Sequence, residues 1–249
     1  MILILGMPRS GTSFVCQILE NFGFNFNIND ENKLDNIYLP NIKYYQHKNL
    51  HFKIYETDAK FFKNVKINLE LPNTEIIKEP YLLFFLESIK DKVKKIILVV
   101  RNPTENIESI KNFGKINNSN KQLAGYNEWN LYYINFLQII RKVNIPFIII
   151  NYNNFKIDYN YEVNKLKNFL NIQIDNNSQN KINFKNNNNY DMINVPPLSK
   201  YIYLNLISNN TNKYTDILKN YKNISKIKPN DMCYCNSSKK YKKCCNLIC

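Results

Sequence analysis

The sequence contains no long apolar run. A helix needs roughly 18 or more consecutive apolar residues to cross a bilayer, and no segment of the 249-residue chain reaches that length. The apolar start, residues 1–5, is too short for the core of a signal peptide, and it leads directly into a polar loop. We therefore interpret it as the first buried strand, and we expect a cytoplasmic protein without a membrane span. Cysteines in that compartment stay reduced.

Arginine is scarce as well. The chain has 34 lysines and arginines, but only Arg9, Arg101 and Arg141 are arginine. The formal net charge of +14 suits acidic partners of several kinds, nucleic acid among them. The lysines, however, are spread along the whole chain. This distribution disfavours nucleic acid as the main ligand. The few arginines stand where a guanidinium could bind an anion through two parallel hydrogen bonds.

Four short apolar runs predict buried strands, and helical patterns alternate with them. Strands separated by helices predict an α/β fold, with a parallel sheet and helices on both of its faces. Sites in such folds lie outside the carboxyl ends of the strands, where the loop at Gly6 and the turns after Lys78 and Arg101 are expected. The predicted strands are residues 2–5, 75–78, 95–100 and 146–151, and the predicted helices are residues 13–22, 104–113, 122–143, 161–170 and 198–221.

The strongest local signal follows the first predicted strand. Gly6, four further residues and Gly11 form a glycine-bounded loop before a helical pattern. The first N–H groups of a helix have no intrahelical partner, so such a loop can bind an anion. A loop of the form G-x-x-x-x-G-K-[ST], typical of nucleotide triphosphatases, has a lysine where this chain has Thr12. Arg9, inside the loop, suits forked hydrogen bonds to phosphate or sulfate instead. The alternative is a purely structural turn.

A second predicted strand, residues 95–100, leads into Arg101, and Ser109 follows eight residues later. Together the two motifs resemble those of sulfotransferases that use 3′-phosphoadenosine 5′-phosphosulfate (PAPS), in which a P-[KR]-[ST]-G-T-[ST] loop binds the 5′-phosphosulfate. The resemblance covers about residues 1–225. It implies a P-loop-like three-layer α/β sandwich, with a sulfuryl group moving from PAPS to a hydroxyl or amine of a small molecule or carbohydrate. The residues that it assigns to PAPS are Pro8, Arg9, Ser10, Gly11, Thr12 and Ser13 at the 5′ end, and Arg101 and Ser109 at the 3′-phosphate.

The candidate catalytic groups stand at the end of the second predicted strand. Sulfuryl transfer needs positive groups at the oxygens of the moving group, and a base for the proton of the acceptor. Arg9 can supply positive charge. In cytosolic members of the family a lysine and then a histidine stand where this chain has Lys78 and Glu79. We therefore assign Glu79 as the general base and Lys78 as a contact to the leaving group or sulfuryl group. The alternative is an ordinary ion pair at the end of a strand.

His47 and His51 are the only histidines of the chain. Either is an alternative base if the irregular segment 25–73, which suits an insertion facing the acceptor, folds over the site. Because that segment is rich in tyrosine and lysine, we expect both histidines at the surface. Glu56 and Asp58 are weaker candidates.

Two segments near the end of the predicted fold carry further expectations. Residues 146–155 and the helical pattern after them resemble a strand, a tyrosine-centred loop and a closing helix of the same family. Tyr152 takes the aromatic position, and we expect it to serve in packing. Residues 176–189 are rich in asparagine and predict a solvated loop or linker.

Four of the six cysteines lie close together near the C-terminus. They place four thiols within thirteen positions, enough for one tetrahedral zinc ion. Residues 226–249 resemble the SEC-C zinc-binding motif, with Asn-Ser-Ser at residues 236–238 where that motif has Gly-Ser-Gly. The resemblance implies a structural zinc and contact with a protein or ribosome; the alternative is a reactive tail without metal. The four predicted ligands are Cys233, Cys235, Cys244 and Cys245.

Two other functions stay open. A nucleotide kinase or related phosphoryl transferase would use a similar loop, although the missing lysine argues against it. A catalytically degenerate nucleotide-binding protein, docked to a partner by the zinc tail, would keep both anion sites without transferring a group. The predicted organisation is a sulfotransferase-like domain over residues 1–225 and a zinc-binding motif over residues 226–249.

Overall fold

The chain folds into two compact units. The first consists of Met1–Arg101 and Ile139–Asn186, and the second of Asn102–Gln138 and Asn187–Cys249. The predicted boundary after residue 225 stays a prediction. The computed structural model describes residues 1–28, 45–47, 50, 69–116, 125–173, 192, 195–208, 210–224, 230 and 240.

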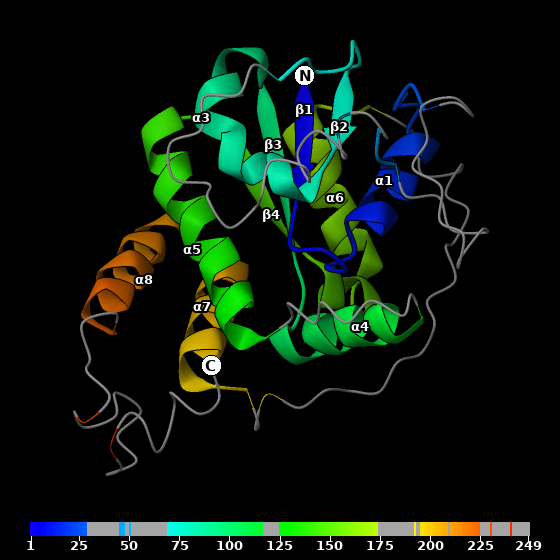
Figure 1. The fold of residues 1–249 in the computed structure, drawn as a ribbon. Coiled ribbons are helices and arrows are strands. Elements are labelled where there is room, and N and C mark those ends of the chain that lie inside the picture. Colours follow the sequence, from blue (N-terminus) through cyan, green and yellow to red (C-terminus); the bar gives the residue numbers. More distant parts are fainter. Residues whose placement is uncertain are drawn as a thin grey trace. The chain divides into compact units, whose positions relative to one another are not determined.

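The first unit is built on a four-stranded parallel sheet in the order β2-β1-β3-β4 (Figure 1). Its strands consist mainly of isoleucine, leucine and valine, which fit a pleated and buried surface. Strand β1 is buried along its whole length, as is typical of parallel sheets flanked by helices. The predicted α/β fold is confirmed, with β2 and β4 each one residue shorter than expected. The strands are β1 (Ile2–Leu5), β2 (Ile76–Lys78), β3 (Lys95–Val100) and β4 (Phe147–Asn151).

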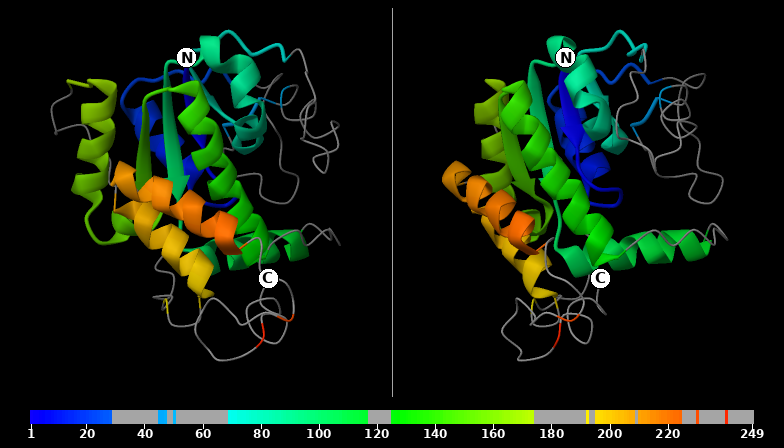
Figure 2. Two further views of the ribbon diagram at one scale, coloured as in Figure 1. Left: turned by 90° about the vertical axis from the view of Figure 1, so that its left-hand side faces the viewer. Right: turned by 60° about the vertical axis from the view of Figure 1, so that its left-hand side comes forward.

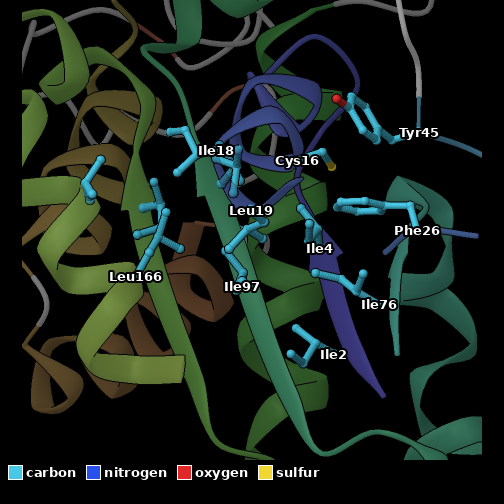
Figure 3. Close-up of a cluster of buried hydrophobic side chains, with 14 of the residues drawn as sticks. Ile2, Ile4, Cys16, Ile18, Leu19, Phe26, Tyr45, Ile76, Ile97 and Leu166 are labelled. Carbon is cyan, nitrogen blue, oxygen red and sulfur yellow. The ribbon is translucent and has the colours of Figure 1, made fainter. Parts of the chain in front are cut away.

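Two helices of the first unit, α1 (Thr12–Asn21) and α6 (Tyr159–Leu170), pack in one cluster with side chains of the sheet. Figure 3 shows this cluster, to which β1 contributes Ile4, α1 contributes Ile18 and α6 contributes Leu166. All three of these side chains are at most 1% exposed. Burying each contributes about 1.5–3 kcal/mol, so the cluster holds α1, and the loop before it, against the sheet.

Short 3₁₀ helices follow two of the strands. Helix η2 (Pro80–Phe85) follows β2, and its first turn is capped by the side chain of Glu79. Helix η4 (Tyr152–Lys156) follows β4, and Asn151 caps it in the same way. Both caps therefore lie at the carboxyl ends of strands. Two further short elements, α3 (Leu86–Ile89) and η3 (Lys90–Lys92), complete the connection from β2 to β3.

The second unit is helical in its described part. Helices α7 and α8 lie side by side (Figure 2). Helices α5 and α7 contact each other through aromatic rings. The ring centroid of the buried Trp129 of α5 lies 6.4 Å from that of Tyr203 of α7. The helices are α4 (Pro103–Ile116), α5 (Tyr126–Val143), which ends in the first unit, α7 (Pro197–Ile207) and α8 (Thr211–Ile224).

The prediction of one continuous helix over residues 198–221 is wrong, because α7 and α8 are separate helices. At the end of α7, the hydroxyl of Ser208 donates to the carbonyl of Asn205 at 2.8 Å. At the start of α8, the N–H of Asn212 donates to Oδ1 of Asn210 at 3.1 Å. Serine and asparagine side chains compete in this way for backbone hydrogen bonds, so they favour helix ends over helix interiors.

The longest helix in the described ranges is α5, with 18 residues. Its sequence carries Glu128, Arg141 and Lys142 among apolar residues. Across the ranges that the structure describes, no helix combines the length and the apolar character that crossing a membrane requires.

Two predicted segments lie mostly or wholly outside the described residues. Of the irregular segment 25–73, the structure describes residues 25–28, 45–47, 50 and 69–73. None of the residues 176–189 is described. The expectation of a solvated loop there, and of an acceptor-facing insertion in 25–73, therefore stays a prediction.

Candidate active site

Three strands of the first unit bring candidate residues to one edge of the sheet. Strand β1 leads into the loop 6–11, β2 ends at Lys78, and β3 leads into Arg101. In the parallel register, Ile4 pairs with Lys78, and the next residue of β1 pairs with Leu98. The carboxyl ends of parallel strands share one edge, where ligands bind in this class of fold.

The loop between β1 and α1 is closely packed against its neighbours at both glycines. A Cβ on Gly11, which has a φ of 100°, would lie 2.1 Å from Cδ2 of Tyr152. A Cβ on Gly6 would lie 2.6 Å from the carbonyl oxygen of Val99. Arg9, between them, also has a left-handed backbone, with a φ of 67°. This conformation costs a non-glycine residue about 1–3 kcal/mol, and such strain concentrates at ligand-binding loops.

The hydroxyl of Ser10, in the same loop, is buried and has no hydrogen-bond partner among the described residues. Its Oγ makes no hydrogen bond within the described structure, and the residue is 0% exposed. An unpaired buried polar group costs about 1–3 kcal/mol. An oxygen of a bound phosphate or sulfate would supply the missing acceptor. The loop therefore fits an anionic ligand.

Arg101 is held against this loop. Its Nη1 donates to the carbonyl oxygen of Arg9 at 3.1 Å. Its guanidinium lies over the ring of Tyr152, with Cζ 4.9 Å from the ring centroid, a contact type worth about 0.5–2 kcal/mol. Tyr152 in turn packs edge-on against Phe14, with ring centroids 5.8 Å apart. These contacts fix a planar cation beside the loop 6–11.

Tyr152 was expected to serve in packing, and it does pack against Gly11 and Phe14. Its contact with Arg101 was missed. A signal for that contact exists in the topology, because Tyr152 is the first residue after β4 and Arg101 the first after β3. These strands are neighbours, and Val100 pairs with Asn151.

Lys78 and Glu79 are joined through an amide. Nζ of Lys78 donates to Oε1 of Gln46 at 3.1 Å, and Nε2 of Gln46 donates to Oε2 of Glu79 at 2.8 Å. The N–H of Tyr81 donates to the other carboxylate oxygen at 3.2 Å. The exposed fractions of Lys78, Gln46 and Glu79 are 4%, 7% and 1%. The two candidate catalytic groups thus belong to a buried network, not to an exposed ion pair.

Burial lowers the pKa of Lys78 from 10.5 to about 8. Desolvation is the largest cause, and the nearby charge of Arg9 acts in the same direction, while Cys16 and Glu79 act in the opposite one. Lys78 is therefore mostly a cation at pH 7 and loses its charge as the pH rises through about 8. A buried cation of this kind can stabilise negative charge that develops on a leaving group.

Gln46 is the member of this network that the sequence analysis missed. It lies in the irregular segment 25–73, where no hydrophobic periodicity predicts which residues turn inward. One glutamine among many polar residues carries no signal of its own. Only the fold shows that this glutamine contacts both Lys78 and Glu79.

His47 is buried, so the expectation of a surface position is wrong for this histidine. It is 6% exposed, and its Nε2 lies 3.0 Å from the carbonyl oxygen of Phe26. Because a carbonyl only accepts, Nε2 carries the proton. Burial lowers the pKa of His47, and the bond to Phe26 offsets part of this effect. His51, Glu56 and Asp58 lie outside the described residues.

The remaining predicted ligands of PAPS lie in both units. Pro8 belongs to the loop of the first unit, and Thr12 and Ser13 form the first turn of α1. Ser109 lies half-buried on α4, in the second unit. Joint binding of one phosphate by Arg101 and Ser109 therefore stays a prediction.

The predicted zinc site also stays a prediction. Among the residues that the structure describes, no group of three or more histidine, cysteine, aspartate or glutamate residues could hold a metal ion. Cys16 is a buried thiol of α1. The predicted ligands, which lie outside the described residues, are Cys233, Cys235, Cys244 and Cys245.

Comparison with known proteins shows the family to which the chain belongs. The family model of the sulfotransferase domain matches residues 1–223. No curated protein matches the sequence. Among solved structures, the chain is similar to mouse sulfotransferase SULT7A1 complexed with PAP, at 18% sequence identity and a TM-score of 0.42. That similarity covers 71% of this chain and 60% of the mouse chain. Because the family match spans most of the sequence and includes the loop, Lys78, Glu79 and Arg101, the chain belongs to the sulfotransferase domain family.

Proposed function

We propose that this protein transfers a sulfuryl group from PAPS to a hydroxyl or amine of a small-molecule or carbohydrate acceptor. The observation that carries the proposal is the placement of Arg101, held by Arg9 and Tyr152 beside a glycine-bounded anion loop. Membership of the sulfotransferase domain family supports the same donor. PAPS carries an anionic group at each end of its ribose, and this edge of the sheet offers a cation at one position and a helix N-terminus at the other.

The proposed reaction assigns a role to each group at the edge. The acceptor atom attacks sulfur in line with the oxygen that bridges to the 5′-phosphate. The bond from sulfur to this oxygen breaks, and adenosine 3′,5′-bisphosphate leaves with the electron pair. Arg9, Lys78 and the N–H groups of the loop stabilise the charge on the leaving oxygen. Glu79 takes the proton of the acceptor, with neutral His47 as the alternative base. Arg101 and Ser109 bind the 3′-phosphate.

A transfer assay with PAPS labelled by sulfur-35 tests the proposal. We expect label to pass to at least one class in a panel of phenols, sugars, aliphatic alcohols and amines. Transfer of γ-phosphate from ATP with magnesium, and none from PAPS, would instead identify a phosphoryl transferase. Binding of the bisphosphate without transfer to any acceptor would support the degenerate binding protein. Either result would overturn the proposed activity.

Replacing Gly11 with alanine is expected to weaken binding of adenosine 3′,5′-bisphosphate by about tenfold or more, measured by titration calorimetry. The added Cβ would overlap the ring of Tyr152, over which the guanidinium of Arg101 lies. Losing a hydrogen bond to a charged group costs about 1.5–3 kcal/mol, which is about tenfold or more in affinity. Gly23→Ala is the matched control, because Gly23 also has a positive φ, of 88°, but has no atom within 4 Å of the added Cβ. Equal losses in both variants would show that backbone strain alone is responsible.

We also propose one structural zinc ion per chain, bound by Cys233, Cys235, Cys244 and Cys245. Four thiolates within thirteen positions form the donor set of a closed tetrahedral site. A cytoplasmic location belongs to this proposal, since such thiols need a reducing compartment. The proposal also includes contact of residues 226–249 with a protein or ribosome.

Elemental analysis of protein purified without chelators is expected to find about one zinc per chain. Cys244→Ser should lose most of this zinc, because a structural site needs its four ligands. Cys249→Ser should keep it, since Cys249 lies outside the predicted set. Zinc-free wild-type protein would contradict the proposal.

A further inference from the structure

The amide of Gln46 contacts both groups to which the proposed reaction assigns charge. Its oxygen accepts from the ammonium of Lys78, and its nitrogen donates to the carboxylate of Glu79. This orientation follows from the chemistry of the partners, because the reversed amide would set a donor against the ammonium and an acceptor against the carboxylate. A neutral amide therefore meets a cation at one end and an anion at the other.

The position of Gln46 in the fold explains why two neighbouring residues need a third to connect them. Lys78 is the last residue of β2, and Glu79 continues in an extended backbone conformation. Side chains of consecutive extended residues leave the strand on opposite faces. Gln46 comes from a distant part of the sequence and contacts both side chains in the buried interior.

We propose that Gln46 is a positioning residue for sulfuryl transfer, one that orients the ammonium of Lys78 and the carboxylate of Glu79. This inference rests on the proposed function, and it adds a residue that neither the family motifs nor the sequence pattern indicates. One ammonium proton of Lys78 is committed to Gln46, which directs the other two away from the amide. On Glu79, Gln46 and the N–H of Tyr81 each bond to one oxygen, so the plane of the carboxylate is fixed.

The charges around Lys78 define what a change at Gln46 would do. Arg9 opposes the charge of Lys78, while Glu79 and Cys16 favour it. A carboxylate at position 46 would favour the charged form of Lys78 further, which raises the pKa of Lys78. An apolar side chain at position 46 would remove the hydrogen bond from the ammonium, which lowers the pKa of Lys78.

Two variants test the inference. Gln46→Glu keeps the shape and the acceptor toward Lys78, and Gln46→Met keeps the length without either hydrogen bond. We expect kcat to fall about 10- to 100-fold in both, with the affinity for adenosine 3′,5′-bisphosphate within about twofold of wild type. The alkaline limb of the pH–rate profile should move upward in Gln46→Glu and downward in Gln46→Met. Gln138→Glu, at an exposed position of α5, is the control. It should change neither kcat nor the pH–rate profile.

A direct titration separates this inference from the activity itself. The pKa of Lys78 can be followed by NMR of its side chain, labelled with carbon-13 and assigned through Lys78→Arg. We expect Gln46→Glu to raise it and Gln46→Met to lower it, each by about one unit or more, whether or not the acceptor is known. An unchanged Lys78 pKa in both folded variants, or an unchanged kcat, would overturn the role of Gln46. If wild-type protein transfers no sulfuryl group but the pKa moves as expected, the proposed function fails while the coupling of the two charges stands.

Discussion

Replacing Glu79 with glutamine is expected to lower kcat for sulfuryl transfer by about 10²- to 10⁴-fold, the usual contribution of a general base. The affinity for adenosine 3′,5′-bisphosphate should stay within about twofold of wild type, because the groups proposed to bind the donor are Arg101, Ser109 and the loop. The fold should also survive. The amide oxygen of glutamine can still accept from the N–H of Tyr81, which Glu79 caps at the start of η2, while the bond from Nε2 of Gln46 is lost. Steady-state kinetics and calorimetry on the same preparation measure the two quantities.

Glu75→Gln provides the matched control for this variant. Glu75 is an exposed carboxylate directly before β2, whereas Glu79 directly follows that strand. The control should leave kcat unchanged. A Glu79→Gln enzyme with the wild-type rate would remove Glu79 from the mechanism and leave His47, buried with its proton on Nε2, as the base to test.

Replacing Arg101 with alanine is expected to weaken binding of adenosine 3′,5′-bisphosphate by about 10- to 150-fold, while AMP, which has no 3′-phosphate, binds nearly as before. Hydrogen bonds to charged groups contribute about 1.5–3 kcal/mol, which corresponds to this range. Arg101→Lys should recover only part of the loss, because lysine keeps the charge without the planar fork. Calorimetry with both nucleotides measures the ratio of the affinity for the bisphosphate to the affinity for AMP.

Arg141→Ala is the control for Arg101. Arg141 is exposed in the last turn of α5, so its loss changes the net charge equally without touching the loop. Both nucleotides should bind it as they bind wild type. An Arg101→Ala protein that loses affinity for AMP and the bisphosphate equally would show that Arg101 supports the loop through the carbonyl of Arg9 and does not recognise the 3′-phosphate.

The strands, the glycine-bounded loop and the positions of Lys78 and Arg101 follow from the sequence because each depends on local chemistry. Runs of β-branched residues mark the buried strands, and residues that follow parallel strands meet at one edge of the sheet. The loop could be recognised from its two glycines. Gly6 and Gly11 stand where neighbouring atoms leave no room for a Cβ.

The parts that the sequence analysis missed depend on contacts between distant segments. Gln46 reaches Lys78 and Glu79 from a region without periodicity, and Tyr152 meets Arg101 only because β4 pairs with β3. The break between α7 and α8 was missed for another reason. Side chains of serine and asparagine ended one helix and began the next, while the apolar pattern favoured a single helix.

The central claim is that one ligand with a phosphate at each end of its ribose occupies the edge formed by the loop and Arg101. A thermal-shift comparison of adenosine 3′,5′-bisphosphate with AMP and ATP tests it most directly, because a ligand that binds only the folded state raises Tm by mass action. We expect a clear rise in Tm with the bisphosphate, and a much smaller one with AMP or ATP at the same concentration. Equal shifts with all three nucleotides, or a larger shift with ATP, would contradict it.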